Sequence, residues 1–146
     1  EKKNHAPYFE LRGRDSFLAV HTPCVLLQRT TAKEQARRLI AAELPADFLA
    51  KHGAVVVENH LNMIRPIAAK PVIPVSVIAA FLNSQAADRV FRCVSGSVAV
   101  SAYELEAMPL PAPEELFHLS RLVADRAGNA AIEAECARLY REPAKK

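Results

Sequence analysis

The stretch "VSVIAAFLNSQAADRVFRCV" (Val75–Val94) decides how the rest of the chain must be arranged. Its apolar residues recur as doublets almost all round the helical wheel, and Pro74 before it is suited to the first turn of a helix. A helix that is apolar on nearly every side belongs in a protein core. We therefore predict one long, buried central helix, with a single polar stripe of Gln85, Arg89 and Arg92 at positions i, i+4 and i+7.

The segments at the start of the chain have strand-like patterns. Two of them are "YFELRG" (8–13) and "SFLAVHTPCVLLQRT" (16–30), the second interrupted at Pro23. Within the latter, the apolar run Cys24–Leu27 indicates a buried strand that runs out near Arg29. We expect these strands to form part of a small twisted sheet packed on the central helix.

A third strand is predicted for "GAVVVENHLNMIRP" (53–66), which lies between Gly53 and Pro66 and begins with β-branched residues. Side chains alternate between the two faces of a strand. One face would carry Val57, Asn59, Leu61 and Met63, and the other Glu58, His60 and Asn62.

Between the second and third strands, "TAKE" has the spacing of a capping box, in which Thr31 and Glu34 satisfy the first amides of a helix. We predict a helix from about Thr31 to Glu43, ending before Pro45. Its buried side would hold Ala32, Ala36, Leu39 and Ile40, and its other side Lys33 and Arg37.

After the central helix, Ser95-Gly96-Ser97 is expected to end it. A short strand "SVAVS" (97–101) and one helical turn "AYELEAM" (102–108) follow, and the prolines of "PLPAP" (109–113) exclude further helix until Pro113. From there to Arg141 we predict an amphipathic helix, kinked or divided at Gly128-Asn129. Its inward residues would be Leu116, Leu119, Val123, Ile132, Cys136 and Leu139.

These elements predict an α+β fold: a small twisted sheet packed on a buried central helix, with a C-terminal amphipathic helical segment. At 146 residues the chain is expected to be one domain, with a core over 1–112 and the helical segment over 113–146. Because the sequence begins at Glu1 rather than Met, we expect a fragment of a longer chain.

Composition narrows the class of protein. The chain is 51% hydrophobic and 24% charged, as is usual for a soluble globular protein, and it has no apolar run of the roughly 20 residues that span a bilayer. The three cysteines, Cys24, Cys93 and Cys136, are far apart and odd in number. This pattern favours a reducing compartment, here the cytoplasm, and no metal or membrane partner.

Positive charge is concentrated in the first half of the chain. Residues 1–70 contain 11 Lys and Arg against 7 Asp and Glu, whereas residues 71–146 contain 8 against 9. The stretch from Ser16 to Lys33 has no acidic residue. A basic face of this kind is compatible with a polyanionic partner, and equally with an ordinary solvated surface.

The sequence offers few groups for catalysis. His21 stands near Cys24, which permits a Cys–His nucleophile, but Cys24 opens an apolar strand where a buried thiol is the ordinary outcome. Ser95 is not in a G-x-S-x-G elbow, and the four glycines form neither G-x-G-x-x-G nor a P-loop. We predict no catalytic, metal-binding or cofactor-binding residue in this chain.

Polar groups suited to binding occur in three places. A predicted strand-to-helix junction would offer guanidinium, hydroxyl and amide groups to phosphates. The third strand supplies side chains of the kind that pair with adenine edges, and the polar stripe with its serine-rich loop supplies another set. The first set is Arg29, Thr30, Thr31, Lys33 and Arg37, the second is Asn59, His60 and Asn62, and the third is Gln85, Arg89, Arg92, Ser95 and Ser97. The alternative for each is a solvated or backbone-capping side chain.

Three stretches resemble the C-terminal part of bacterial adenine-specific DNA methyltransferases of restriction–modification systems. They are "PCVLLQRTTAKEQARRLIAA" (23–42), "VVVENHLNMI" (55–64) and "FLNSQAADRVFRCVSGSVAVSAYELEAMPLP" (81–111), so the resemblance covers roughly Pro23 to Pro113. In that family a catalytic domain that binds S-adenosylmethionine precedes a target-recognition domain. The family's glycine motif for the cofactor and its Asn/Asp-Pro-Pro-Tyr/Phe motif are both absent here.

The resemblance therefore implies a detached recognition domain with no cofactor of its own. It would bind double-stranded DNA and position it for an N-terminal methyltransferase domain of the parent chain, in which S-adenosylmethionine is expected. Two alternatives stay open. One is a protein-interaction or oligomerisation module that uses the helical segment from Pro113 to Arg141, and the other is a small hydrolase that uses Cys24 and His21.

Overall fold

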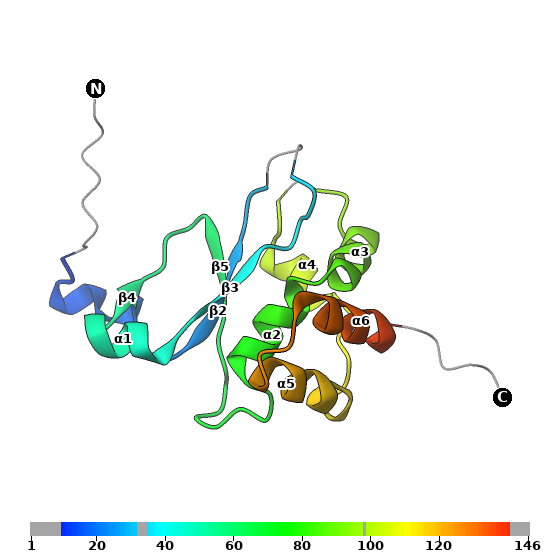
Figure 1. The fold of residues 1–146 in the computed structure, drawn as a ribbon. Helices are drawn as coiled ribbons and strands as arrows, with labels where there is room; N and C mark the ends of the chain where they lie inside the picture. The colour runs from blue at the N-terminus through cyan, green and yellow to red at the C-terminus, as the bar shows by residue number, and fades with distance from the viewer. Residues whose placement is uncertain (1–9, 32–34, 98, 141–146) are drawn as a thin grey trace.

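A computed structural model describes residues 10–31, 35–97 and 99–140 (Figure 1). It confirms the predicted α+β class. Its elements in chain order are η1 (Gly13–Leu18), β1 (Ala19–Val20), β2 (Cys24–Gln28), β3 (Ala41–Leu44), α1 (Ala46–His52), β4 (Val55–Val56), β5 (Leu61–Ile64), α2 (Val75–Leu82), α3 (Gln85–Val94), α4 (Ala102–Glu106), η2 (Pro113–Leu116), α5 (Phe117–Ala124) and α6 (Asn129–Leu139). None of the helices within these ranges is both long and apolar enough to cross a bilayer.

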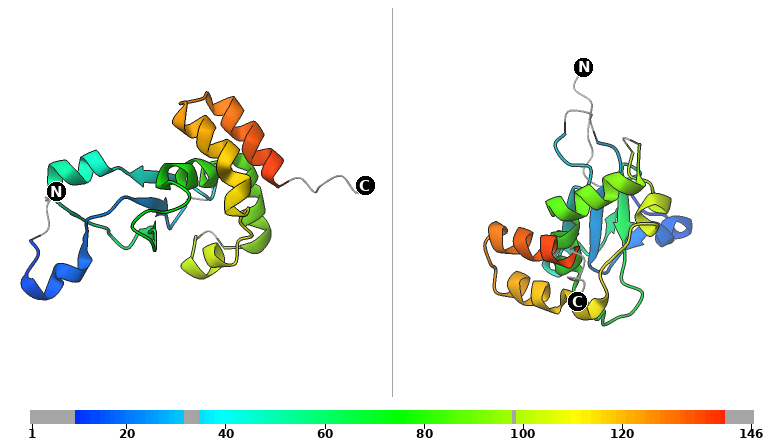
Figure 2. Two further views of the ribbon diagram at one scale, coloured as in Figure 1. Left: turned by 90° about the horizontal axis from the view of Figure 1, so that it is seen from below. Right: turned by 90° about the vertical axis from the view of Figure 1, so that its right-hand side faces the viewer.

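The strands form two small antiparallel sheets. One has the order β3-β2-β5, so the predicted buried strand β2 is its centre, with Val25 opposite both Glu43 and Ile64. The other pairs β1 with β4 and lies beside α1, at the end of the molecule away from the C-terminal helices (Figures 1 and 2). A minor core of Val20, Cys24, Leu44 and Leu49 fills this end.

The main core lies between the three-stranded sheet and the helices. α2 packs against β2 and β3 on one side and against α5, α6 and α3 on the other, which is the central position predicted for it. Val25 and Leu27 of β2 meet Phe81, Phe91 and Leu119 there, all at most 1% exposed. Burial of aliphatic and aromatic side chains of this size stabilises a fold by about 1.5–3 kcal/mol each.

The single long helix predicted over Val75–Val94 is wrong in one respect, because it is two helices. α2 ends at Leu82 and α3 begins at Gln85. Between them, the Asn83 side chain bonds the main chain of Ala41, and the Ser84 hydroxyl accepts a hydrogen bond from the Ala87 amide at 3.1 Å as the N-cap of α3. Asn83 and Ser84, which were predicted to lie inside one helix, are therefore the residues that separate α2 from α3.

The helix predicted from Thr31 to Glu43 is also wrong. Residues 35–40 are irregular and Ala41–Leu44 is strand β3; Ala32, Lys33 and Glu34 lie outside the described residues. Leu39 is buried as expected, but Ala36 is exposed. Helix propensity is a weak prior that tertiary contacts override, and here β2 and side chains of α2 and α3 bond this segment in an extended form.

The strand predicted over residues 53–66 is interrupted. Glu58–Leu61 form a turn, in which the Leu61 amide donates to the Glu58 carbonyl oxygen at 3.1 Å, so the predicted alternation of faces across it fails. The turn allows the chain to leave the small sheet through β4 and enter the larger one through β5.

Three further strand predictions also differ from the structure. In "YFELRG" (8–13), Tyr8 and Phe9 lie outside the described residues, and Glu10–Arg12 has no strand. The start of the next predicted strand belongs to the 3₁₀ helix η1, with Phe17 79% exposed, so that β1 begins only at Ala19. "SVAVS" contributes a single bridge between Thr30 and Ala99 in its described part.

The main C-terminal predictions are confirmed, except that the amphipathic segment begins as the 3₁₀ helix η2 and that Arg141 lies outside the described residues. α3 ends before Ser95, α4 is one short helix, and a reversal over residues 125–128 divides the amphipathic segment into α5 and α6. α4 starts with a true capping box, in which the Ser101 hydroxyl accepts from the Glu104 amide and the Glu104 carboxylate accepts from the Ser101 amide. Leu116, Leu119 and Cys136 are buried, and Val123, Ile132 and Leu139 pack beside them.

A buried carboxylate, Glu135, joins α6 to α5. It accepts hydrogen bonds from Arg138 Nε and Nη2 at 2.8 and 2.7 Å, and its Oε2 lies 3.0 Å from His118 Nδ1 of α5. Hydrogen bonds from Arg138 outweigh burial and hold the pKa of Glu135 at about 2, below its ordinary 4.5. Because the folded-state pKa is lowered, this interaction stabilises the protein above pH 4.5 and is lost as the pH falls towards 2.

We therefore expect Glu135→Gln to lower the free energy of unfolding at pH 7 by about 1–2 kcal/mol, a modest loss because Arg138 is more than half exposed. The difference between variant and wild type should shrink between pH 4.5 and pH 2. Urea denaturation at several pH values measures both effects. A difference that stays constant over this range would contradict the role given to the carboxylate.

Candidate nucleic-acid interface

Three segments meet at the end of strand β2, around Arg29. Its amide donates to the His60 carbonyl oxygen at 2.8 Å, and its own carbonyl oxygen accepts from the Val100 amide at 2.7 Å. The next residue, Thr30, bridges to Ala99. The turn after β4 and the strand-like residues before α4 are therefore held on either side of the exposed Arg29 side chain.

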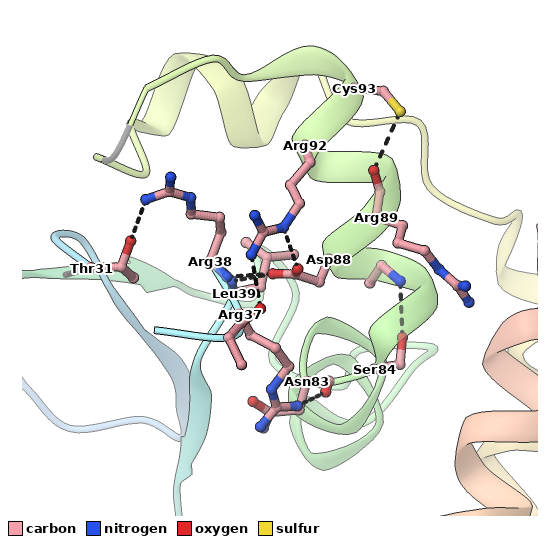
Figure 3. Close-up of polar contacts among 12 residues, drawn as sticks. Thr31, Arg37, Arg38, Leu39, Asn83, Ser84, Asp88, Arg89, Arg92 and Cys93 are labelled. Carbon is pink, nitrogen blue, oxygen red and sulfur yellow. Dashed lines mark hydrogen bonds and ion pairs between the residues drawn. The ribbon is translucent and has the colours of Figure 1, made fainter. Parts of the chain in front are cut away.

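Segment 35–40 lies on the other side of the β2 end, because it continues β3. Arg38 Nη1 donates to the Thr31 hydroxyl at 3.1 Å. The main-chain amides of Arg38 and Leu39 both donate to one carboxylate oxygen of Asp88, on α3 (Figure 3). This irregular segment is therefore fixed by α3 rather than by a helix of its own.

Asp88 is the centre of these contacts. It is 4% exposed, and its second carboxylate oxygen accepts from Arg92 Nε at 2.7 Å. Burial raises the pKa of Asp88, but hydrogen bonds from Arg92 and from the Leu39 and Arg38 amides lower it further, so the net pKa lies below the ordinary value. Arg92 in turn donates through Nη2 to the Ala36 carbonyl oxygen at 2.9 Å.

Asn83 fixes the same segment at Ala41, the first residue of β3. Its Oδ1 accepts from the Ala41 amide at 2.9 Å and its Nδ2 donates to the Ala41 carbonyl oxygen at 2.5 Å, so the side chain pairs with the edge of β3 as a strand would. The Asn83 carbonyl oxygen also accepts a hydrogen bond from Arg37 Nη1. The helix break and the arginine-bearing segment are thus joined by three bonds.

Four arginines, which lie after β2, in segment 35–40 and on α3, have no carboxylate within 4.0 Å among the residues that the structure describes: Arg29, Arg37, Arg38 and Arg89. Arg29 donates weakly to the Asn59 carbonyl oxygen at 3.4 Å, and Arg89 projects away from the Asp88 cluster (Figure 3). We call these four residues the arginine face. Its charge is uncompensated locally, which is the electrostatic character of a surface that binds polyanions.

The structure uses several of the predicted binding residues internally. Asn62 Nδ2 donates to the Val100 carbonyl oxygen at 2.6 Å, and the buried Ser95 donates to Glu104 at 2.6 Å. The Ser97 hydroxyl accepts from the Ala99 amide, and Thr31 is 3% exposed. These side chains hold the loops in place and have little left to offer a ligand.

Other predicted residues keep accessible groups. Arg29, Asn59, Gln85 and Arg89 are exposed. Within the described chain, the side-chain amides of Asn59 and Gln85 have no hydrogen-bond partner. His60 is exposed but pairs with Glu58, Nδ1 to Oε1 at 2.6 Å. Lys33 lies outside the described residues.

Arg37, Gln85, Arg89 and Arg92 also line a hollow of about 400 Å³ between segment 35–40 and α3. Sequence reasoning missed Asp88, which lines this hollow, and Arg38 and Asn83, whose hydrogen bonds hold the segment beside it. Asp88 is the only acidic residue within the otherwise basic stripe of α3, and such an isolated acid between arginines is a signal that could have been used.

Other chemistry has little support in this structure. Cys24 is fully buried, and burial raises the pKa of its thiol despite the nearby positive charge of Arg65. The His21 ring instead lies 3.2 Å from the Gly53 carbonyl oxygen, measured from Nδ1. No group of three His, Cys, Asp or Glu side chains within the described ranges could hold a metal ion.

Comparison with known proteins gives no relative: no family model, curated protein or solved structure matches the chain. The arginine face, with the exposed Asn59 and Gln85 beside it, is thus the feature on which a function can be based.

Proposed function

We propose that this chain is a non-catalytic DNA-recognition domain, which holds duplex DNA in position for a methyltransferase domain elsewhere in its parent chain. The observation that carries the proposal is the arginine face, four guanidinium groups without carboxylate partners in the described structure. Three of them, Arg37, Arg38 and Arg89, are on segments tied together by Asp88 and Asn83. The resemblance found in the sequence supports the narrower assignment to a site-specific adenine methyltransferase that uses S-adenosylmethionine.

The two kinds of group on this surface suit two kinds of contact. The arginines would bind phosphates, which gives affinity without sequence preference and makes that affinity depend on salt. Asn59 lies in the turn beside Arg29, and its free amide is suited to paired hydrogen bonds with an adenine edge. Phosphate contacts would therefore set the register, and this turn would read bases.

We expect Arg29→Ala and Asn59→Ala to differ in kind. Loss of Arg29 should weaken binding to all duplexes alike and reduce the slope of log K against log salt by about 1. Loss of Asn59 should leave that slope unchanged and instead reduce discrimination at one base pair, by about 1–3 kcal/mol. Fluorescence anisotropy with a randomised duplex pool, at several salt concentrations, measures both quantities.

Arg121→Ala on α5 is a suitable control, since this exposed arginine lies away from the β2 end. It should leave slope and sequence choice unchanged. An unaltered slope in Arg29→Ala, or a uniform loss of affinity in Asn59→Ala, would count against the roles assigned to them.

The interaction-module alternative has less support. The apolar residues of α5 and α6 on which it would depend, such as Leu119 and Cys136, are already packed against α2 and α3 within one chain. A concentration-dependent oligomer that ignores duplex DNA at low salt would nevertheless favour it over DNA recognition.

A further inference from the structure

A second hollow, of about 480 Å³, lies where the end of α2 and the start of α3 meet the start of α6. Its apolar lining comes from Ala80 and Ile132, and its polar lining includes Arg37, Gln85, Asn129 and Glu133. Arg37 and Gln85 also line the 400 Å³ hollow beside Arg89 and Arg92, so the two hollows are neighbours. We call the 480 Å³ hollow the groove, and its size is within the range of small-molecule sites.

Several polar groups in this hollow have no partner in the described parts of the chain. The side-chain amides of Gln85 and Asn129 make no hydrogen bond there. With respect to the described residues, Arg37 uses only Nη1, which donates to the Asn83 carbonyl oxygen, so the other guanidinium donors remain for a ligand.

Glu133 is held in place at the same end of the hollow. Its Oε2 accepts from the Gln85 main-chain amide at 3.0 Å, and its Oε1 lies 3.3 Å from the same nitrogen. A carboxylate has about four acceptor positions, so Glu133 can accept further hydrogen bonds from a ligand without leaving Gln85. The hollow thus has an anchored acceptor at one place and an unsaturated guanidinium at another.

We propose that this groove binds a nucleotide whose base carries an exocyclic amino group. The phosphate would lie on the free donors of Arg37, and the amino group would donate to Glu133. The amides of Gln85 and Asn129 would meet the rest of the base edge, and Ile132 and Ala80 would contact its plane. This site does not require a duplex, so it goes beyond DNA recognition, and its ligand is either a mononucleotide or an unpaired nucleotide within a strand.

Calorimetric titration of the full chain with small ligands tests this. Adenosine and cytidine monophosphates should bind, whereas uridine monophosphate, adenosine and ribose 5-phosphate should each bind at least about tenfold more weakly than adenosine monophosphate. Glu133→Gln, which keeps an acceptor for the Gln85 amide, should abolish the preference for adenosine over uridine monophosphate. Asn129→Ala, an exposed site, should weaken adenosine monophosphate about tenfold.

A duplex with one unpaired adenosine separates the two sources of ligand. If adenosine monophosphate binds, the free nucleotide is sufficient. If it does not bind, but the duplex with the unpaired adenosine binds more tightly than the fully paired duplex and Asn129→Ala removes that gain, the ligand is a nucleotide within a strand. The proposal fails if neither result occurs, or if ribose 5-phosphate binds as well as adenosine monophosphate.

The outcomes also separate this site from the DNA interface. Asn59→Ala should not change nucleotide affinity, and Asn129→Ala should not change the salt slope for a fully paired duplex. If the nucleotide experiments contradict the groove proposal, the result for the fully paired duplex would still stand. If the duplex experiments contradict DNA recognition, the nucleotide result would still stand.

Discussion

Asp88→Ala is expected to lower the free energy of unfolding by about 3–5 kcal/mol, the range for removing one partner from a buried charged network. The substitution leaves the main-chain amides of Arg38 and Leu39 without their acceptor and removes the buried partner of Arg92. Guanidinium chloride denaturation at pH 7 measures the loss. The pKa of Asp88 is lowered in the folded state. The stability difference between Asp88→Ala and wild type should therefore be largest at pH values above the ordinary pKa of an aspartate, and it should diminish as the pH falls below that pKa.

Asp125→Ala provides the matched control, because this aspartate at the end of α5 is exposed. It should change stability by less than about 0.5 kcal/mol. Asp88→Asn should give an intermediate loss, since one amide oxygen can still accept from the two main-chain amides. A variant Asp88→Ala as stable as wild type would show that segment 35–40 does not depend on α3.

Replacing all four residues of the arginine face by glutamine should have the largest effect on DNA binding. If each guanidinium neutralises one phosphate, the salt slope should fall by about 3.6, at about 0.9 per contact. Charge-assisted hydrogen bonds of about 1.5 kcal/mol or more apiece would lower affinity at low salt by about four orders of magnitude. The measurement is duplex affinity over a salt series.

Replacement of the same four positions by lysine is the control for charge. Lysine keeps the positive charge but loses the planar, bidentate geometry of arginine. The salt slope should therefore be retained while affinity falls only partly. Equal loss of slope in both variants, with both folded by circular dichroism, would mean that damage to the local structure and not lost charge explains the result.

The larger features of the fold could be predicted because they depend on burial alone. The apolar run Cys24–Leu27 was predicted as a buried strand and is the centre of the larger sheet, and Val75–Leu82 lies within the predicted core helix. The stop after α3 and the division before Asn129 were predicted from Ser95-Gly96-Ser97 and Gly128-Asn129, because these residue types have strong local preferences for turns.

The error at residues 35–44 occurred because distant side chains determine the backbone there. Residues 35–44 favour a helix by composition, yet β2, Asn83 and Asp88 bond them as extended chain, over sequence separations of 42 and 49 residues for Asn83–Ala41 and Asp88–Leu39. No local pattern contains such a partner. The capping box predicted at Thr31 and Glu34 includes Glu34, which lies outside the described residues, whereas the box at Ser101 and Glu104 was not predicted.

The candidate site was predictable in its residue types but not in their roles. Arg29, Asn59 and Arg89 were correctly chosen as exposed groups, whereas Ser95 and Asn62 turn out to bond neighbouring loops. Whether a serine or asparagine faces solvent or a carbonyl depends on which loop lies beside it, and this follows only from the tertiary arrangement.

The two anchors on segment 35–44 have a consequence for chain length. Leu39 is held by Asp88 and Ala41 by Asn83, so two fixed points stand two residues apart along an extended chain. A single residue inserted between Leu39 and Ala41 would shift the register of β3, so that the two hydrogen-bonded positions no longer match and every later side chain of β3 turns to the opposite face. Natural or engineered variation in the length of this part of the molecule should therefore be confined to positions before Arg38, where neither clamp is disturbed.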